Sequence, residues 1–145
     1  MCGEAAPPTS SMCPAPCEHC AGQTECWVQC NLSSNDCNGQ VLNCPAGLPC
    51  RVHCSFNDCL GTTVVCPPDG SACVIDCGSG GCVDLTVQCG GGPCSLDCAS
   101  AGTCSNAVID CGDNACSVIC DAQTALPMWN AGNTCQLNIG ADCVL

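Results

Sequence analysis

Two short hydrophobic–polar patterns alternate along most of the chain. The first places a β-branched residue or leucine midway between two cysteines, as in CVIDC at residues 73–77. Residues i, i+2 and i+4 of a strand face the same side. The pattern therefore predicts a five-residue strand in which Cys73, Ile75 and Cys77 point inward. The segments of this form are CWVQC (26–30), CRVHC (50–54), CVIDC (73–77), CSLDC (94–98) and CSVIC (116–120).

The second pattern holds two cysteines with six residues between them and ends in a shorter alternation of apolar and polar positions. In CVDLTVQC (82–89), Leu85 and Val87 are predicted to face inward, and Thr86 and Gln88 outward. The segments of this form are CNGQVLNC (37–44), CLGTTVVC (59–66), CVDLTVQC (82–89) and CSNAVIDC (104–111).

The two patterns together form an internal repeat. Successive segments of the first kind start 24, 23, 21 and 22 residues apart, and Gly-rich connectors such as GSGG (78–81) and GGGP (90–93) separate the strands. A fixed period with short strands and turn-forming corners is typical of a solenoid. We expect an all-β, disulfide-stapled parallel β-solenoid (β-helix) of about five coils of 21–24 residues.

The ends of the chain follow the repeat loosely. We predict a flexible tether at residues 1–12, an N-terminal cap or partial coil at 13–25, and solenoid repeats over 26–145 with one insertion at 121–134. The insertion carries Leu126, Met128 and Trp129. These side chains either cap the last coil or dock onto another molecule.

Cysteine supplies 24 of the 145 residues, whereas aromatic side chains are nearly absent. Such a content indicates a disulfide framework. Cys73 and Cys77 cannot bond to each other because a strand holds them about 13 Å apart, beyond disulfide reach. The bonds must cross the coil, turn its corners or link neighbouring coils, and the corner pair Cys77–Cys82 is geometrically acceptable. The cysteines assigned to disulfide columns are Cys26, Cys30, Cys37, Cys44, Cys50, Cys54, Cys59, Cys66, Cys73, Cys77, Cys82, Cys89, Cys94, Cys98, Cys104, Cys111, Cys116, Cys120, Cys135 and Cys143.

The repeated segments resemble the secreted cysteine-rich repeat proteins that form disulfide-stapled parallel β-helices, over residues 20–143. More distantly, the plan is similar to insect β-solenoid antifreeze proteins. Separately, CGEAAPPTSS after Met1 resembles the start of a mature bacterial lipoprotein. That second resemblance implies lipidation of Cys2, with Met1 in place of a removed signal peptide.

Cys17 lies outside the columns, and its state is expected to depend on Cys2. If Cys2 is lipidated, Cys17 is the natural unpaired thiol. If Cys2 is not lipidated, the expected bond is Cys2–Cys17.

The net charge of −12, with Arg51 as the only strong base and no lysine, excludes a nucleic-acid partner and disfavours anionic membranes. No apolar run is long enough for a transmembrane helix. Because disulfides persist in oxidising compartments, we expect an extracellular or cell-surface protein. The expected partners are a second copy stacked head to tail, or a cell-surface or matrix component.

Other cysteine and carboxylate chemistry is less well supported. A thiolate metal store usually uses closely spaced ligand pairs, and only CEHC at residues 17–20 has that form. The same motif is the one candidate for a redox thiol. Asp76 and Asp97 occupy equivalent outward positions. They could bind calcium together, and the simpler interpretation is that both belong to a solvated face.

Catalysis and ice binding are also disfavoured. The chain has two histidines and no G-x-S-x-G motif. Ice binding would need a regular outward array, whereas the first-strand columns read Trp, Arg, Val, Ser, Ser and Gln, His, Asp, Asp, Ile. We expect no enzyme and no cofactor. The predicted function is that of an extracellular structural or interaction protein, with a glycan- or protein-binding surface lipoprotein and a metal–thiolate protein as alternatives.

Overall fold

The computed structural model describes residues 13–20, 24–31, 33, 36–98, 103–111, 116–120 and 136–138, which form ten β-strands. Within these residues, no helix is long and apolar enough to cross a membrane. The strands are β1 (Cys26–Cys30), β2 (Val41–Asn43), β3 (Cys50–Cys54), β4 (Thr63–Val65), β5 (Cys73–Cys77), β6 (Thr86–Gln88), β7 (Cys94–Cys98), β8 (Val108–Asp110), β9 (Cys116–Cys120) and β10 (Gln136–Asn138).

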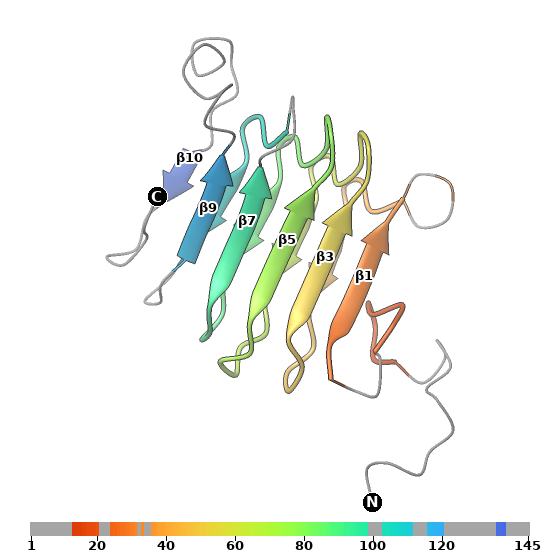
Figure 1. Cartoon of the computed structure of the whole chain (residues 1–145), viewed down its shortest axis with the longest axis vertical. Coiled ribbons are helices and arrows are strands. Elements are labelled where there is room, and N and C mark those ends of the chain that lie inside the picture. The colour runs from red at the N-terminus through yellow and green to blue at the C-terminus, as the bar shows by residue number, and fades with distance from the viewer. Residues whose placement is uncertain are drawn as a thin grey trace, which may run out of the picture.

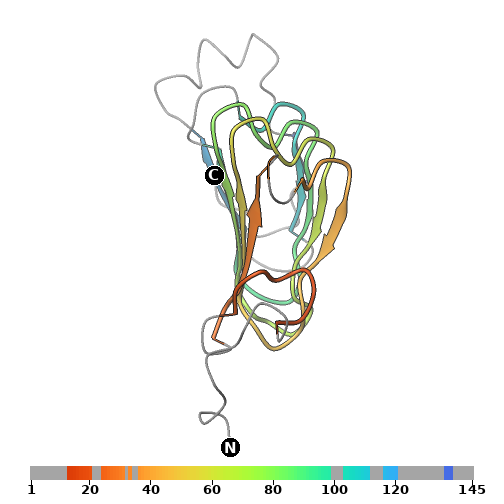
Figure 2. The same cartoon turned by 90° about the vertical axis from the view of Figure 1, so that its right-hand side faces the viewer.

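The strands form two five-stranded parallel sheets that face each other. The first sheet has the order β1-β3-β5-β7-β9 (Figure 1). The second has the order β10-β8-β6-β4-β2. The view turned by 90° shows successive windings nearly superposed around a narrow interior (Figure 2). The chain is therefore a parallel β-solenoid, as the repeat predicts.

The number of windings differs from the expectation. Successive strands of one sheet are one turn apart, so five stacked strands span about four turns rather than five coils. The sequence count was too high because it counted strand segments rather than the intervals between them. Two strands consecutive in the chain, such as β1 and β2, are called a layer below.

Apolar columns fill the interior. In β1, β3, β5 and β7 the first, third and fifth residues are buried and the other two are half-buried. The pairing register aligns the central residues of neighbouring strands. The resulting columns are Val28, Val52, Ile75, Leu96 and Val118 in the first sheet, and Leu42, Val64, Val87 and Ile109 in the second.

The second-sheet strands are shorter than the cysteine spacing allows because the first half of each spacing forms a corner. One corner position has a positive φ in each of the first four layers: Gly39, Gly61, Asp84 and Asn106 lie at 69°, 64°, 55° and 56°. Glycine, Asn and Asp adopt this left-handed conformation more readily than other residues. The local sequence thus turns the chain out of one sheet and into the next.

Candidate functional site

Disulfides close the corners of the solenoid. From Cys30 onward each bond joins two consecutive cysteines and so ties the end of one strand segment to the start of the next, whereas Cys13–Cys20 and Cys17–Cys26 interleave before the solenoid. The corner pair Cys77–Cys82, which strand geometry allowed, is present with 5.9 Å between its Cα atoms. The bonds are Cys13–Cys20, Cys17–Cys26, Cys30–Cys37, Cys44–Cys50, Cys54–Cys59, Cys66–Cys73, Cys77–Cys82, Cys89–Cys94, Cys98–Cys104 and Cys111–Cys116.

The prediction for Cys17 was wrong. It is neither an unpaired thiol nor the partner of Cys2, because it bonds to Cys26 at the start of β1. The reason is the path of the preceding segment, which runs antiparallel to β1 through the bridge between His19 and Trp27. That path brings Cys17 to the start of the strand, with 5.1 Å between the Cα atoms of Cys17 and Cys26.

Several predicted site residues lie outside the described part of the chain. They are Cys2, Leu126, Met128, Trp129, Cys135 and Cys143. Cys120 belongs to β9, and its side chain is also outside the described part. The proposed lipid site and the role of the insertion therefore stay predictions.

Sulfur atoms of stacked disulfides come close together at three corners. Each cluster holds three Sγ atoms within 4.8 Å of one another. In one of them, the Sγ atoms of Cys66 and Cys94, which belong to different disulfides, are 3.8 Å apart. A metal requires thiolates, and these sulfurs are bound in disulfides. The clusters therefore offer no thiolate ligands in the oxidised protein. They consist of Cys30, Cys54 and Cys59; Cys66, Cys89 and Cys94; and Cys77, Cys82 and Cys104.

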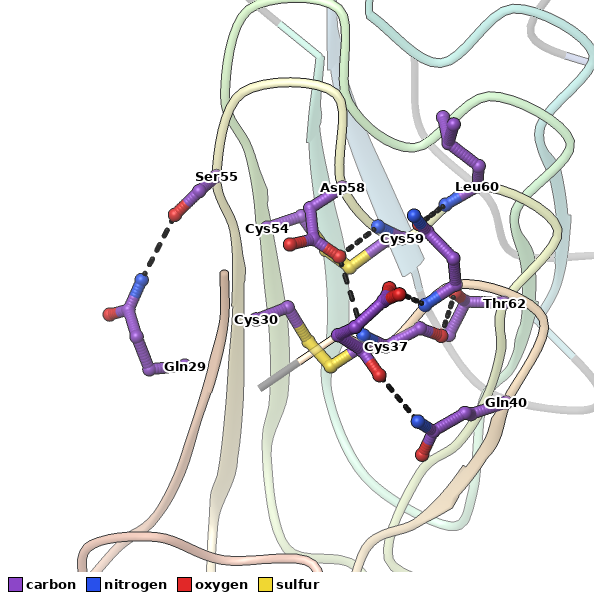
Figure 3. The surroundings of a disulfide bond; sticks show 12 residues. Gln29, Cys30, Cys37, Gln40, Cys54, Ser55, Asp58, Cys59, Leu60 and Thr62 are labelled. Carbon is purple, nitrogen blue, oxygen red and sulfur yellow. Dashed lines mark hydrogen bonds between the residues drawn. A yellow bond between two sulfur atoms is a disulfide. The ribbon is translucent and has the colours of Figure 1, made fainter. Parts of the chain in front are cut away.

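A buried carboxylate organises the corner between the first two layers (Figure 3). Asp58 is fully buried, and its Oδ1 accepts hydrogen bonds from the backbone N–H groups of Cys37 at 3.4 Å and Cys59 at 2.8 Å. The hydroxyl of buried Thr62 donates to the carbonyl of Cys37 at 2.7 Å. Two side chains of the second layer thus hold one cysteine of the first layer. Thr62 stands at the position of Leu85 in its segment and so follows the inward pattern, whereas nothing in the repeat marks Asp58 as inward.

The charges on the outer face of the first sheet are centred on Arg51. Its guanidinium lies 3.3 Å from Glu25, 3.4 Å from Asp76 and 5.5 Å from the centre of the Trp27 ring. The pairing register makes Asp76 and Asp97 direct neighbours, as expected. Arg51 supplies a positive charge to Asp76, so the ion pair partly offsets the repulsion between the two aspartates.

A second carboxylate links layers at the opposite corner. Asp69 accepts hydrogen bonds from the backbone N–H of Gly47 in the preceding layer and from the N–H of Ser71, the latter at 3.3 Å. The Ser71 side chain and these backbone groups favour the ionised form and hold the pKa of Asp69 below its usual value. This exposed corner therefore carries a fixed negative charge near neutral pH.

The outer face of the second sheet has a regular column that the sequence analysis did not consider. Val41, Thr63, Thr86 and Val108 are aligned by the strand register. The signal was available, because each stands three residues before the cysteine that closes its segment. The adjacent outward column is irregular, with Asn43, Val65, Gln88 and Asp110. The regular array is therefore one residue wide.

Comparisons of the chain with protein-family models, with curated proteins and with solved structures found no match. Function must therefore be argued from the geometry of the solenoid itself.

Proposed function

We propose that this protein is a non-catalytic extracellular structural protein, a rigid solenoid displayed at a cell surface or built into an extracellular assembly. The observation that carries the proposal is the unbroken series of corner disulfides from Cys13 to Cys116. A series of this kind stiffens every described layer, and it requires an oxidising environment.

The interior supports this role because apolar side chains and disulfides fill it. The inward columns hold valine, isoleucine, leucine and disulfide sulfur, and the buried carboxylate Asp58 is engaged with backbone N–H groups. Cysteine thiolates are the reactive form of this residue, and disulfide bonding removes them. The cysteines thus serve the fold.

The outer faces favour a structural role over glycan binding. Exposed aromatic rings are the usual stacking platforms for ligands with apolar faces. Among the described residues, the ring of Trp27 lies beneath the guanidinium of Arg51, which in turn pairs with Glu25 and Asp76, and the one strongly exposed ring is that of Phe56. These contacts engage Trp27 and Arg51 within the molecule, and a single ring such as Phe56 offers a small stacking surface. Binding of a protein or glycan by the 121–134 insertion is the alternative.

The test combines localisation with thiol state. Cells that express the native chain are fractionated, and each fraction is treated with an alkylating reagent before any reductant is added. We expect the protein in the medium or on the outer surface, with the cysteines of the ten corner disulfides unmodified. An intracellular chain with most thiols alkylated would refute the proposal and support the metal–thiolate alternative.

A further inference from the structure

The two sheets end differently at the first layer. The outer edge of β1 is covered by residues 17–20. The carbonyl of Trp27 accepts hydrogen bonds from the N–H groups of Glu18 at 2.9 Å and His19 at 3.3 Å, and the Trp27 N–H donates to the His19 carbonyl at 2.8 Å. Two disulfides, Cys13–Cys20 and Cys17–Cys26, fix this covering segment. The first sheet therefore cannot add a further strand at this end.

The outer edge of β2 has no such cover among the described residues. β2 pairs with β4 on one side, where the Thr63 N–H donates to the Gln40 carbonyl and the Cys44 N–H donates to the Val65 carbonyl. Backbone groups alternate between the two edges of a strand. The N–H and C=O groups of Val41 and Asn43 therefore face away from β4. The Val41 side chain is 60% exposed.

Proteins usually protect an open edge with a charged residue, a proline or a bulge. Residues 40–44 read Gln-Val-Leu-Asn-Cys, which contains neither a charge nor a proline, and β2 pairs with β4 in continuous register without a bulge. The same end of the molecule protects β1 thoroughly. This contrast indicates that the β2 edge is available to pair with a further strand.

We infer that the outer edge of β2 receives β10 of a second copy of this chain, so that the second sheet continues from one molecule into the next. The inference rests on the proposed structural role and specifies the partner. The molecule itself contains four parallel pairings of this kind between second-sheet strands, in β2–β4, β4–β6, β6–β8 and β8–β10. β10 ends the same sheet at its other side, with three residues and the same parallel direction.

The register at such a junction is chemically consistent. One further step of the ladder sets the second copy's Gln136 opposite Val41, its Leu137 opposite Leu42 and its Asn138 opposite Asn43. The central residues, Leu137 and Leu42, are both apolar, and no charged residue meets another. A head-to-tail contact of this kind gives an open filament.

The net charge of each chain sets the salt dependence of assembly. Two chains of charge −12 repel each other, although the paired strands themselves carry no charge. Added salt screens this repulsion, so it should strengthen assembly. Binding of a basic peptide to the same edge would weaken with salt, which separates the two kinds of partner.

The experiment uses the full, oxidised chain in sedimentation velocity over a wide range of protein concentration, at low and high sodium chloride. Asn43→Pro removes an outward N–H of β2, which edge strands tolerate. It should weaken association by about tenfold or more, since edge hydrogen bonds are lost. Asn43→Thr keeps the N–H and is the matched control, which should assemble like the unaltered chain. Val41→Glu adds a negative charge to the edge and should also weaken assembly.

Hydrogen exchange provides a readout that does not depend on variants, because assembly should protect the amides of Val41 and Asn43. The inference is overturned if the oxidised chain stays monomeric at all concentrations, if growth stops at a dimer, or if Asn43→Pro assembles like Asn43→Thr. An exported, oxidised chain that is strictly monomeric would overturn this inference alone. A reduced intracellular chain would overturn the proposed function.

Discussion

The carboxylate of Asp58 accepts a hydrogen bond from the backbone N–H of Cys37 in the preceding layer, with 3.4 Å between Oδ1 and N. In the third and fourth layers the equivalent cysteine N–H reaches a backbone carbonyl of the layer before it, as Cys82 does to Asp58 and Cys104 to Gly81. Cys37 belongs to the first layer, and its N–H donates instead to the side chain of Asp58 in the following layer. Asp58 thus links the first two layers through its side chain, where the later layers are linked through the backbone.

Replacement of Asp58 should reveal this role. Asp58→Ala removes the buried oxygen that accepts hydrogen bonds from the N–H groups of Cys37 and Cys59, so we expect the free energy of unfolding to fall by about 1–3 kcal/mol. Asp58→Asn keeps an oxygen at the Oδ1 position and should lose much less. Guanidinium titration without reductant, followed by circular dichroism, measures both. Equal losses for the two variants would show that the charge, rather than the acceptor, is what matters.

Gly90 is predicted to be intolerant of any side chain because of interlayer contact. A Cβ at this position would lie 1.9 Å from the carbonyl oxygen of Pro67 in the layer before it. Gly90→Ala must therefore separate the layers at this corner, with a cost of about 1–3 kcal/mol or more. Thermal unfolding of the oxidised protein measures the loss.

Gly47→Ala is the matched control for that substitution. Gly47 has a φ of 87° and no atom within 4 Å of an added Cβ, so the variant tests backbone strain without a steric clash. We expect it to be the milder of the two changes. A larger loss at Gly47 would contradict the assignment of Gly90 to interlayer packing.

The repeat was readable from the sequence because strand geometry is periodic. The five CxφxC segments coincide with β1, β3, β5, β7 and β9, and the inward and outward faces follow from alternation alone. The connectivity of Cys17 was not readable, because it depends on how residues 13–20 fold back along β1. Asp58 was missed for a related reason. A carboxylate becomes favourable inside only where the ladder leaves N–H groups without partners, and spacing does not show this.

Asp69 should give the interlayer corner a small acid sensitivity. Its pKa is lowered in the folded protein by hydrogen bonds from Ser71 and Gly47, whereas an unfolded aspartate titrates at about 3.9. The contribution is therefore fully present above the unfolded pKa and is lost as the pH falls through the lower folded value. Asp69→Asn should flatten this part of the stability profile. The measurement is the guanidinium midpoint of both proteins from neutral to acid pH, and parallel profiles would contradict the prediction.

Limited reduction should open the disulfides in the order of their exposure. Cys13 and Cys89 are only partly buried, whereas Cys30 and Cys37 are completely buried. A reductant reaches exposed sulfur first. With limiting phosphine, alkylation and peptide mapping should therefore find the bonds of Cys13 and Cys89 open while Cys30–Cys37 is intact. Simultaneous labelling of all pairs would instead indicate that reduction follows global unfolding.

The close sulfur contact predicts a second step after the Cys89–Cys94 bond is opened. The Cys94 thiolate lies 3.8 Å from Cys66, and its attack on the Cys66–Cys73 bond forms Cys66–Cys94 and releases the Cys73 thiolate. No net oxidation or reduction occurs in this exchange. Delayed alkylation should therefore move label from Cys94 to Cys73, faster at higher pH because thiolate is the attacking form. Label that stays on Cys94 at every delay would show that strand packing holds the two sulfurs out of line for attack.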